Sequence, residues 1–158
     1  MKHLTIITFV VALLYLPARH IEFSWYDDGY AYYSAATILA DLKSANLAHL
    51  WEFLREYNVR FRPVYWFWQT SNYVLSGYNP PLHYFWHFVL ILTVGFLLYQ
   101  ASRSVFAVIL LLLSPVNTAN WYRLGPQEPL IAVLILTSFL VWQKYKNNSC
   151  RTISLSKT

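Results

Sequence analysis

The chain has 158 residues, of which 57% are hydrophobic and 12% are charged, and its formal net charge is +5. A soluble globular domain carries about 25% charged residues, so this composition favours a membrane protein that is solvated partly by lipid. The basic residues are scattered and flank apolar runs, which argues against nucleic acid as a partner. Cys150 is the one cysteine, which excludes an internal disulfide and a multi-cysteine metal site.

Four apolar stretches predict an all-α integral membrane protein with about four transmembrane helices. The expected spans cover about residues 3–20, 82–100, 104–116 and 128–143. A spanning helix needs roughly 20 mostly apolar residues, and Arg62 and Arg103 enclose 40 residues without Asp, Glu, Lys or Arg. The first stretch also fits the length of a signal peptide, but no small-residue cleavage site follows it, so we expect a retained helix.

The first outer loop, residues 21–81, is expected to hold amphipathic juxtamembrane helices that lie on the bilayer surface. One apolar face comprises Ala31, Ala35, Ile38, Leu39 and Leu42, and a second comprises Leu47, Leu50, Trp51 and Leu54. A small soluble loop domain is the alternative, although so few large apolar side chains would bury little surface. The aromatic-rich segment 63–75 predicts a further helix at the interface, which Gly77 and Pro80 end.

The C-terminal third predicts a return span, an outer loop and a final span. Ser114-Pro115 stops or kinks the return span, and residues 116–128 form the loop. The single transmembrane domain is expected to cover residues 1–146. Residues 147–158 are polar and are expected to form a disordered tail.

Charge predicts the orientation of these spans. With a cytoplasmic N-terminus, Lys2, Arg103 and Lys144 lie inside, and all seven acidic residues lie outside. Basic residues near span ends fix topology, whereas acids contribute little. Lys and Arg divide six inside and six outside, so the separation of the acids is supporting evidence. We expect a multi-pass protein of the plasma (inner) membrane, with both termini cytoplasmic and the lipid bilayer as a partner.

An acidic pair, Asp27-Asp28, opens the first loop helix and is the leading candidate for chemistry. A helix N-terminus stabilises ionised carboxylates. An ionised carboxylate can act as a general base on an acceptor hydroxyl, or bind a divalent cation such as Mg²⁺ or Mn²⁺, for which Asp28 is the candidate ligand. The alternative is structural, because Ser24-x-x-Asp27 matches a capping box. Both roles coexist if Asp27 caps the helix and Asp28 faces a substrate.

Three arginines and one glutamate on the same outer side are candidate substrate contacts. Arg60 and Arg62 suit a phosphate group, which arginine grips in a bidentate fork, and anchoring to lipid phosphates is the alternative. Glu128 stands at the mouth of the last span, where an ionisable group is costly and is therefore a functional candidate. Pairing of Glu128 with Arg123 is the alternative reading.

Two histidines four residues apart, His83 and His87, share a helix face. This spacing can bind a metal, but no third ligand is visible nearby. We interpret them as interfacial histidines. The sequence also contains no Gly-rich phosphate loop and no nucleophile elbow.

The order of these features is more specific than any one of them. A short first span precedes Asp27-Asp28 and two juxtamembrane helices. The chain continues with Arg62-Pro63 at the entry to the aromatic segment, then with Gly77-Tyr78-Asn79-Pro80 and an outer Arg-Leu-Gly-Pro-Gln-Glu loop. Over about residues 4–145 this order resembles the N-terminal part of multi-spanning GT-C glycosyltransferases, of the protein O-mannosyltransferase and lipid A aminoarabinose transferase type.

The resemblance implies transfer of a sugar from a polyprenyl-phosphate donor to an acceptor outside the cytoplasm. Asp27 and Asp28 would activate the acceptor or help to hold a divalent cation. Arg62 and Arg123 would face the departing lipid phosphate, whose developing charge needs cationic partners.

The chain departs from this family in length, since family members have more spans and commonly a soluble C-terminal domain. The expectation is then an incomplete or inactive fragment. The alternative, from another class, is a small non-catalytic membrane subunit that binds carrier lipid or assembles with another membrane subunit. The sugar, the acceptor and the metal dependence stay open.

Overall fold

All secondary structure in the described part of the chain is helical, which confirms the all-α class. The computed structural model describes residues 2–20, 28–54, 63–115, 117, 122–123 and 128–155. Its helices there are α1 (Lys2–Ala18), α2 (Asp28–Ser44), α3 (Leu47–Leu54), α4 (Pro63–Ser76), α5 (Pro80–Ser102), α6 (Val105–Leu113) and α8 (Glu128–Leu155).

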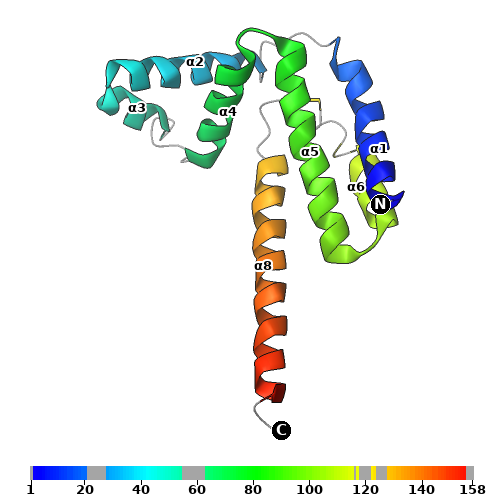
Figure 1. Cartoon of the computed structure of the whole chain (residues 1–158). Coiled ribbons are helices and arrows are strands. Elements are labelled where there is room, and N and C mark those ends of the chain that lie inside the picture. Colours follow the sequence, from blue (N-terminus) through cyan, green and yellow to red (C-terminus); the bar gives the residue numbers. More distant parts are fainter. Residues whose placement is uncertain are drawn as a thin grey trace.

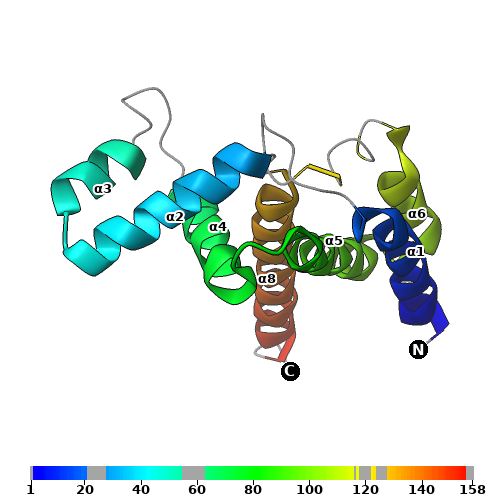
Figure 2. The same cartoon turned by 90° about the horizontal axis from the view of Figure 1, so that it is seen from above.

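Helix α5 is the centre of the arrangement, and it contacts α1, α4, α6 and α8. Figure 1 shows α1, α5 and α6 side by side, with α2, α3 and α4 gathered at one end and α8 extending past the other. Figure 2 shows α2 and α3 on one side of α5, and α1 and α6 on the opposite side. The apolar core of the bundle joins the three central helices through Ile7, Val11, Phe88, Ile91, Val108 and Leu112.

The ends of α5 follow from local chemistry. Asn79 accepts a hydrogen bond from the Leu82 backbone N–H at 3.3 Å, and prolines occupy the first helical positions, as is favourable at a helix start. At the other end Arg103 adopts a left-handed conformation with φ of 57°, which stops the helix. Ser104 then caps α6 by accepting from the Ala107 N–H at 3.2 Å. A tight turn therefore joins α5 to α6.

Helix α5 is the one helix in the described part of the chain that is long and apolar enough to cross a membrane, with a mean hydropathy of 1.6 in its best window. Helix α1 is apolar but shorter, at 17 residues. Helix α6 has nine residues, which is about 14 Å of helix at 1.5 Å per residue. The expected span 104–116 is thus not a continuous crossing helix, and the four-span arrangement stays a prediction.

Helix α8 runs farther than the sequence predicts. Residues 147–155, expected to be part of a disordered tail, continue the helix that begins at Glu128. No Gly or Pro occurs between Leu130 and the end of the chain. Extending an existing helix costs little compared with starting one, so the apolar first half of α8 can propagate into this polar segment.

Gly95 lies where α5 packs against α1 and α6. A Cβ atom there would be 3.1 Å from Ile7 Cγ2 and 3.4 Å from Val108 Cγ1. We expect Gly95→Leu to overpack this contact and to lower the free energy of unfolding by about 1–3 kcal/mol. The measurement is the thermal unfolding midpoint in detergent. The control is Phe96→Leu at a side chain that is 37% exposed, and equal midpoints for the two variants would contradict the prediction.

Candidate functional site

Helix α2 begins at the second residue of the predicted acidic pair. Asp28 is the first residue of the helix, as the sequence predicts. Asp27, Arg60 and Arg62 lie outside the described residues, so their roles stay predictions, as does the metal role of Asp28. The described part of the chain has no group of three or more His, Cys, Asp or Glu residues that could hold a metal ion.

An aromatic cluster fixes the first half of α2 against the start of α5. The Tyr32 ring lies 5.0 Å from the ring of Tyr73 in α4, 5.1 Å from Tyr78 and 6.2 Å from His83 in α5, centroid to centroid. These are edge-to-face contacts, which aromatic pairs favour. Position 28 is one helical turn before Tyr32, so this cluster holds the backbone at Asp28 near the start of α5.

Tyr32 also gives this contact a pH dependence. A side-chain hydrogen bond with Tyr73 and, to a lesser degree, burial raise the pKa of Tyr32 above its ordinary 10.0. A raised pKa means that the folded state holds the phenolic proton more tightly than the unfolded state does. The stabilisation is therefore fully present below about pH 10 and is lost as the pH rises through the folded-state pKa.

We expect Tyr32→Phe to lower stability by about 0.5–1 kcal/mol at pH 8 and to flatten the fall in stability above pH 10. The measurement is the chemical unfolding midpoint at pH 8 and pH 11. Tyr33→Phe, at a neighbouring ring that is 68% exposed, serves as the matched control. Parallel declines for the Tyr32 variant and the unmodified protein would contradict this expectation.

An apolar groove of about 550 Å³ opens between α2, α3 and α4. Its walls include Ile38, Leu39 and Leu42 of α2, Leu50 of α3, and Trp66 and Val74 of α4. The predicted apolar faces of the first two loop helices thus turn partly toward each other and toward α4. Pockets that hold small ligands have volumes of about 300–1,000 Å³, so the groove can seat part of an apolar chain.

Thr70 adds a polar atom to the groove wall. Its residue is 9% exposed, and its Oγ1 has no hydrogen-bond partner among the described residues. A buried hydroxyl without a partner is costly. The groove therefore offers one hydrogen-bonding group to an occupant.

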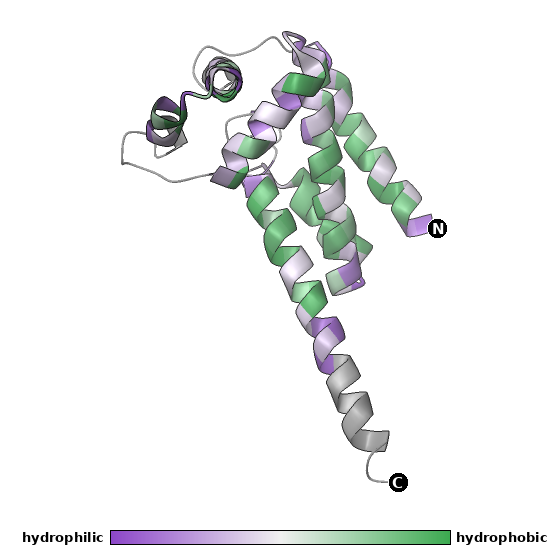
Figure 3. Cartoon of the chain, turned by 60° about the vertical axis from the view of Figure 1, so that its left-hand side comes forward, coloured by the Kyte–Doolittle hydropathy of each residue, from purple (hydrophilic) through white to green (hydrophobic). Residues whose placement is uncertain are grey.

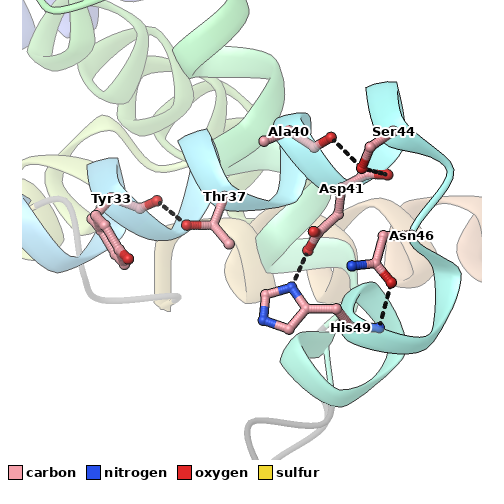
Figure 4. Close-up of polar contacts among 7 residues, drawn as sticks. All are labelled: Tyr33, Thr37, Ala40, Asp41, Ser44, Asn46 and His49. Atoms are coloured by element: carbon pink, nitrogen blue, oxygen red, sulfur yellow. Dashed lines mark hydrogen bonds and ion pairs between the residues drawn. The ribbon is translucent and has the colours of Figure 1, made fainter.

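A carboxylate–imidazole pair holds the corner between α2 and α3, and Figure 4 shows its contacts. His49 Nδ1 donates to Asp41 Oδ2 across 2.7 Å, and the side chains are 46% and 10% exposed respectively. Ala45, with φ of 53°, reverses the chain between the helices, and Asn46 Oδ1 accepts from the His49 backbone N–H at 3.4 Å. Sequence reasoning missed this pair, although an acid and a histidine on either side of a helix break were its signal.

Arg123 and Glu128 both lie on the surface. Arg123 is exposed and follows Tyr122, whose hydroxyl donates to Leu14 O at 2.6 Å. Glu128 is exposed at the first residue of α8, where the helix dipole favours a carboxylate. Leu130, two residues later, packs against the cluster of Ile38, Tyr65 and Trp66, so the start of α8 adjoins the groove helices.

The histidines of α5 are buried within the fold, and their place at the membrane interface stays a prediction. His83 and His87 are each 2% exposed. His83 Nε2 lies 2.8 Å from Gly77 O, and Asn72 Nδ2 donates to His83 O at 3.5 Å. The turn at Gly77 folds α4 back onto the start of α5, which covers this face of the helix.

Comparisons of the chain with protein-family models, with curated proteins and with solved structures found no match. The resemblance to GT-C glycosyltransferases therefore rests on the order of the sequence features alone. Of the predicted site residues, the structure describes the start of α2 at Asp28, together with Arg123 and Glu128.

Proposed function

We propose that the chain is a membrane glycosyltransferase, or part of one, that transfers a sugar from a polyprenyl-phosphate donor to an acceptor outside the cytoplasm. The main support for this proposal is the position of α2. Helix α2, which begins at Asp28, is held by Tyr32 at the end of the bundle where α5 begins, beside an apolar groove.

The opposite end of the bundle carries basic residues. The ring of His3, next to Lys2, lies 5.4 Å from the ring of Tyr99 near the end of α5, and Arg103 follows that helix. Figure 3 shows hydrophilic residues at the start of α1 and at the α5–α6 turn, with apolar helix between them and the α4 end. This separation supports a cytoplasmic N-terminus under the positive-inside rule, with the acidic pair outside.

The proposed reaction needs a base and a cationic site for the leaving group. Asp27 or Asp28 would take the proton of the acceptor hydroxyl while its oxygen bonds to the anomeric carbon of the sugar. The bond between that carbon and the phosphate oxygen breaks, and the polyprenyl phosphate leaves. Arg62 and Arg123 would stabilise the charge that develops on the phosphate, and the groove would seat part of the apolar chain.

Membrane orientation is tested by labelling single cysteines from outside intact cells. In a Cys150→Ser background, a membrane-impermeant maleimide is expected to modify Ser44→Cys, at the end of α2. It is expected to modify Ser102→Cys, at the end of α5, only after lysis. Both serines are exposed, so buried positions do not explain a difference. Labelling at 102 but not at 44 in intact cells would place the acidic pair in the cytoplasm and overturn the proposal.

A further inference from the structure

Helix α8 carries an apolar surface that the rest of the described chain leaves uncovered. Large apolar side chains are exposed along its first half, at Ile131, Leu134, Ile135, Phe139 and Val141. At 3.6 residues per turn, these positions spread over about 160° of the helix circumference. Figure 1 shows α8 extending past the end of α5. Exposed apolar surface of this breadth marks a site of interaction with a protein or a membrane.

The surface of α8 changes character within one unbroken helix. No Asp, Glu, Lys or Arg occurs from Pro129 to Gln143, and Lys144 and Lys146 follow directly. Both lysines are exposed, and the helix continues past them to Leu155. Figure 3 shows the change from apolar to hydrophilic residues along α8. Because the backbone is helical on both sides of the change, this position is a boundary between two solvents and not the end of an element.

Trp142 and Lys146 contact each other at this boundary. Nζ of Lys146 lies 5.5 Å from the centroid of the Trp142 ring, which is within the range of cation–π attraction. The Trp142 side chain is 56% exposed, and tryptophan collects at membrane–water interfaces. A lysine beside such a ring lays its apolar stem along the surface and keeps its charged end at the level of the lipid head groups.

We propose that α8 binds anionic phospholipids, with their acyl chains against its exposed apolar side chains and their head groups at Lys144 and Lys146. Charge complementarity selects an anionic lipid, because no Asp or Glu follows Glu128 in the sequence and no carboxylate on this part of the helix neutralises the lysines. Each lysine near an anionic membrane surface strengthens binding by about fivefold. The inference shares with the proposed function only the membrane location of the chain.

The residues of this surface favour lipid over a second protein helix as the occupant. Helices that pack together in a membrane are enriched in small residues where they meet, whereas large side chains such as Ile135 and Phe139 project from α8. A partner helix would also have no need of the order found along α8. Apolar residues, then an interfacial tryptophan, then lysines is the order in which a bilayer changes from hydrocarbon to head group.

Lipid binding is measured on the full chain in vesicles, with a fluorophore on α8 as the reporter. Ser138 is exposed one turn before Trp142, so Ser138→Cys in a Cys150→Ser background is labelled with bimane. Brominated phosphatidylglycerol or brominated phosphatidylcholine then replaces the unbrominated lipid stepwise. Quenching by the brominated chains gives the relative binding constants of the anionic and the zwitterionic lipid at this position.

The labelled protein is expected to prefer phosphatidylglycerol by about fivefold or more, and 1 M salt should weaken the preference by screening. Combining Lys144→Gln with Lys146→Gln is expected to remove the preference, whereas Lys146→Arg, which keeps the charge, should retain it. Lys43→Gln removes an exposed cation from the end of α2 and is the matched control, which should leave the preference unchanged.

Three results would overturn the proposal. One is equal quenching by the two lipids in the labelled protein that carries both lysines. Another is a double lysine variant that keeps the full preference for the anionic lipid. The third is the absence of quenching by either lipid, which would identify a second copy or another protein as the occupant of this face. Sugar transfer by a chain that shows no lipid preference would sink this inference alone and leave the proposed function standing.

Discussion

Sugar transfer is expected to fall by about 10²- to 10⁴-fold when Asp27→Asn and Asp28→Asn are combined. The range is what removal of a positioned general base costs. Asparagine keeps the size of each side chain and its capacity to cap a helix, so α2 should still start at position 28. The amide cannot accept the proton of an acceptor hydroxyl. The measurement is transfer of radiolabelled sugar from a prenyl-phosphate donor in membranes that contain the chain.

The control for the acidic pair is Glu52→Gln, which removes one exposed carboxylate from α3. Glu52→Gln is expected to leave sugar transfer unchanged. The double variant and Glu52→Gln should insert into the membrane equally, as tested by maleimide labelling of Ser44→Cys in each. Undiminished transfer by the double variant would rule out the acids as the base. If sugar transfer occurs only in a complex with another membrane subunit and is not reduced by the two substitutions, the chain is an accessory subunit instead.

The largest loss of stability is expected from Trp66→Ala. Trp66 is fully buried in a cluster with Ile38 and Tyr65, against which Leu50 of α3 and Leu130 of α8 also pack. Truncating a buried Trp or Phe to Ala typically costs about 3–5 kcal/mol, because the apolar contacts are lost and a cavity is left. Since this cluster joins four helices and Trp66 is its largest side chain, loss of the ring should release α2 and α3 from α4.

This release is measured by limited trypsin digestion. Lys43 is exposed in the last turn of α2, so cleavage after it should be at least about tenfold faster in the variant, in proportion to the population that opens. Amide exchange in α1, α5 and α6 should change little, because their core cluster is separate from that of Trp66.

The matched control for this variant is Trp51→Ala, which removes the same side chain from a position that is 53% exposed. It should alter neither the unfolding midpoint nor the cleavage rate appreciably. If the two tryptophan variants behaved alike, Trp66 would not be the residue that holds the groove helices together.

Helix boundaries could be read from the sequence where a strong local signal marks them. The aromatic segment expected over residues 63–75 is helix α4, Pro63–Ser76, and α6 ends at Leu113 before the predicted break at Ser114-Pro115. Proline and glycine act through their own backbone restrictions, so these breaks do not depend on distant residues. Where no such signal exists, as in residues 147–155, polarity alone misjudged the helix.

The partners of each helix face could not be read in the same way. The sequence predicts that Ile38, Leu39 and Leu42 share an apolar face, and in the structure they line a groove that α3 and α4 complete. Periodicity shows that a face is apolar, but it does not show what covers it. His83 illustrates the same point, because the turn at Gly77 buries it.

Composition and charge spacing alone predicted a helical chain with an apolar centre, basic ends and an acidic pair at the start of one helix, because these features depend only on which residues are neighbours along the chain. The pairing of Asp41 with His49 and the contact of Tyr32 with His83 arose from folding. Each requires the angle at which one helix leaves a turn and meets the next, as at Ala45. That angle is set by packing among residues far apart in the sequence, which local spacing does not encode.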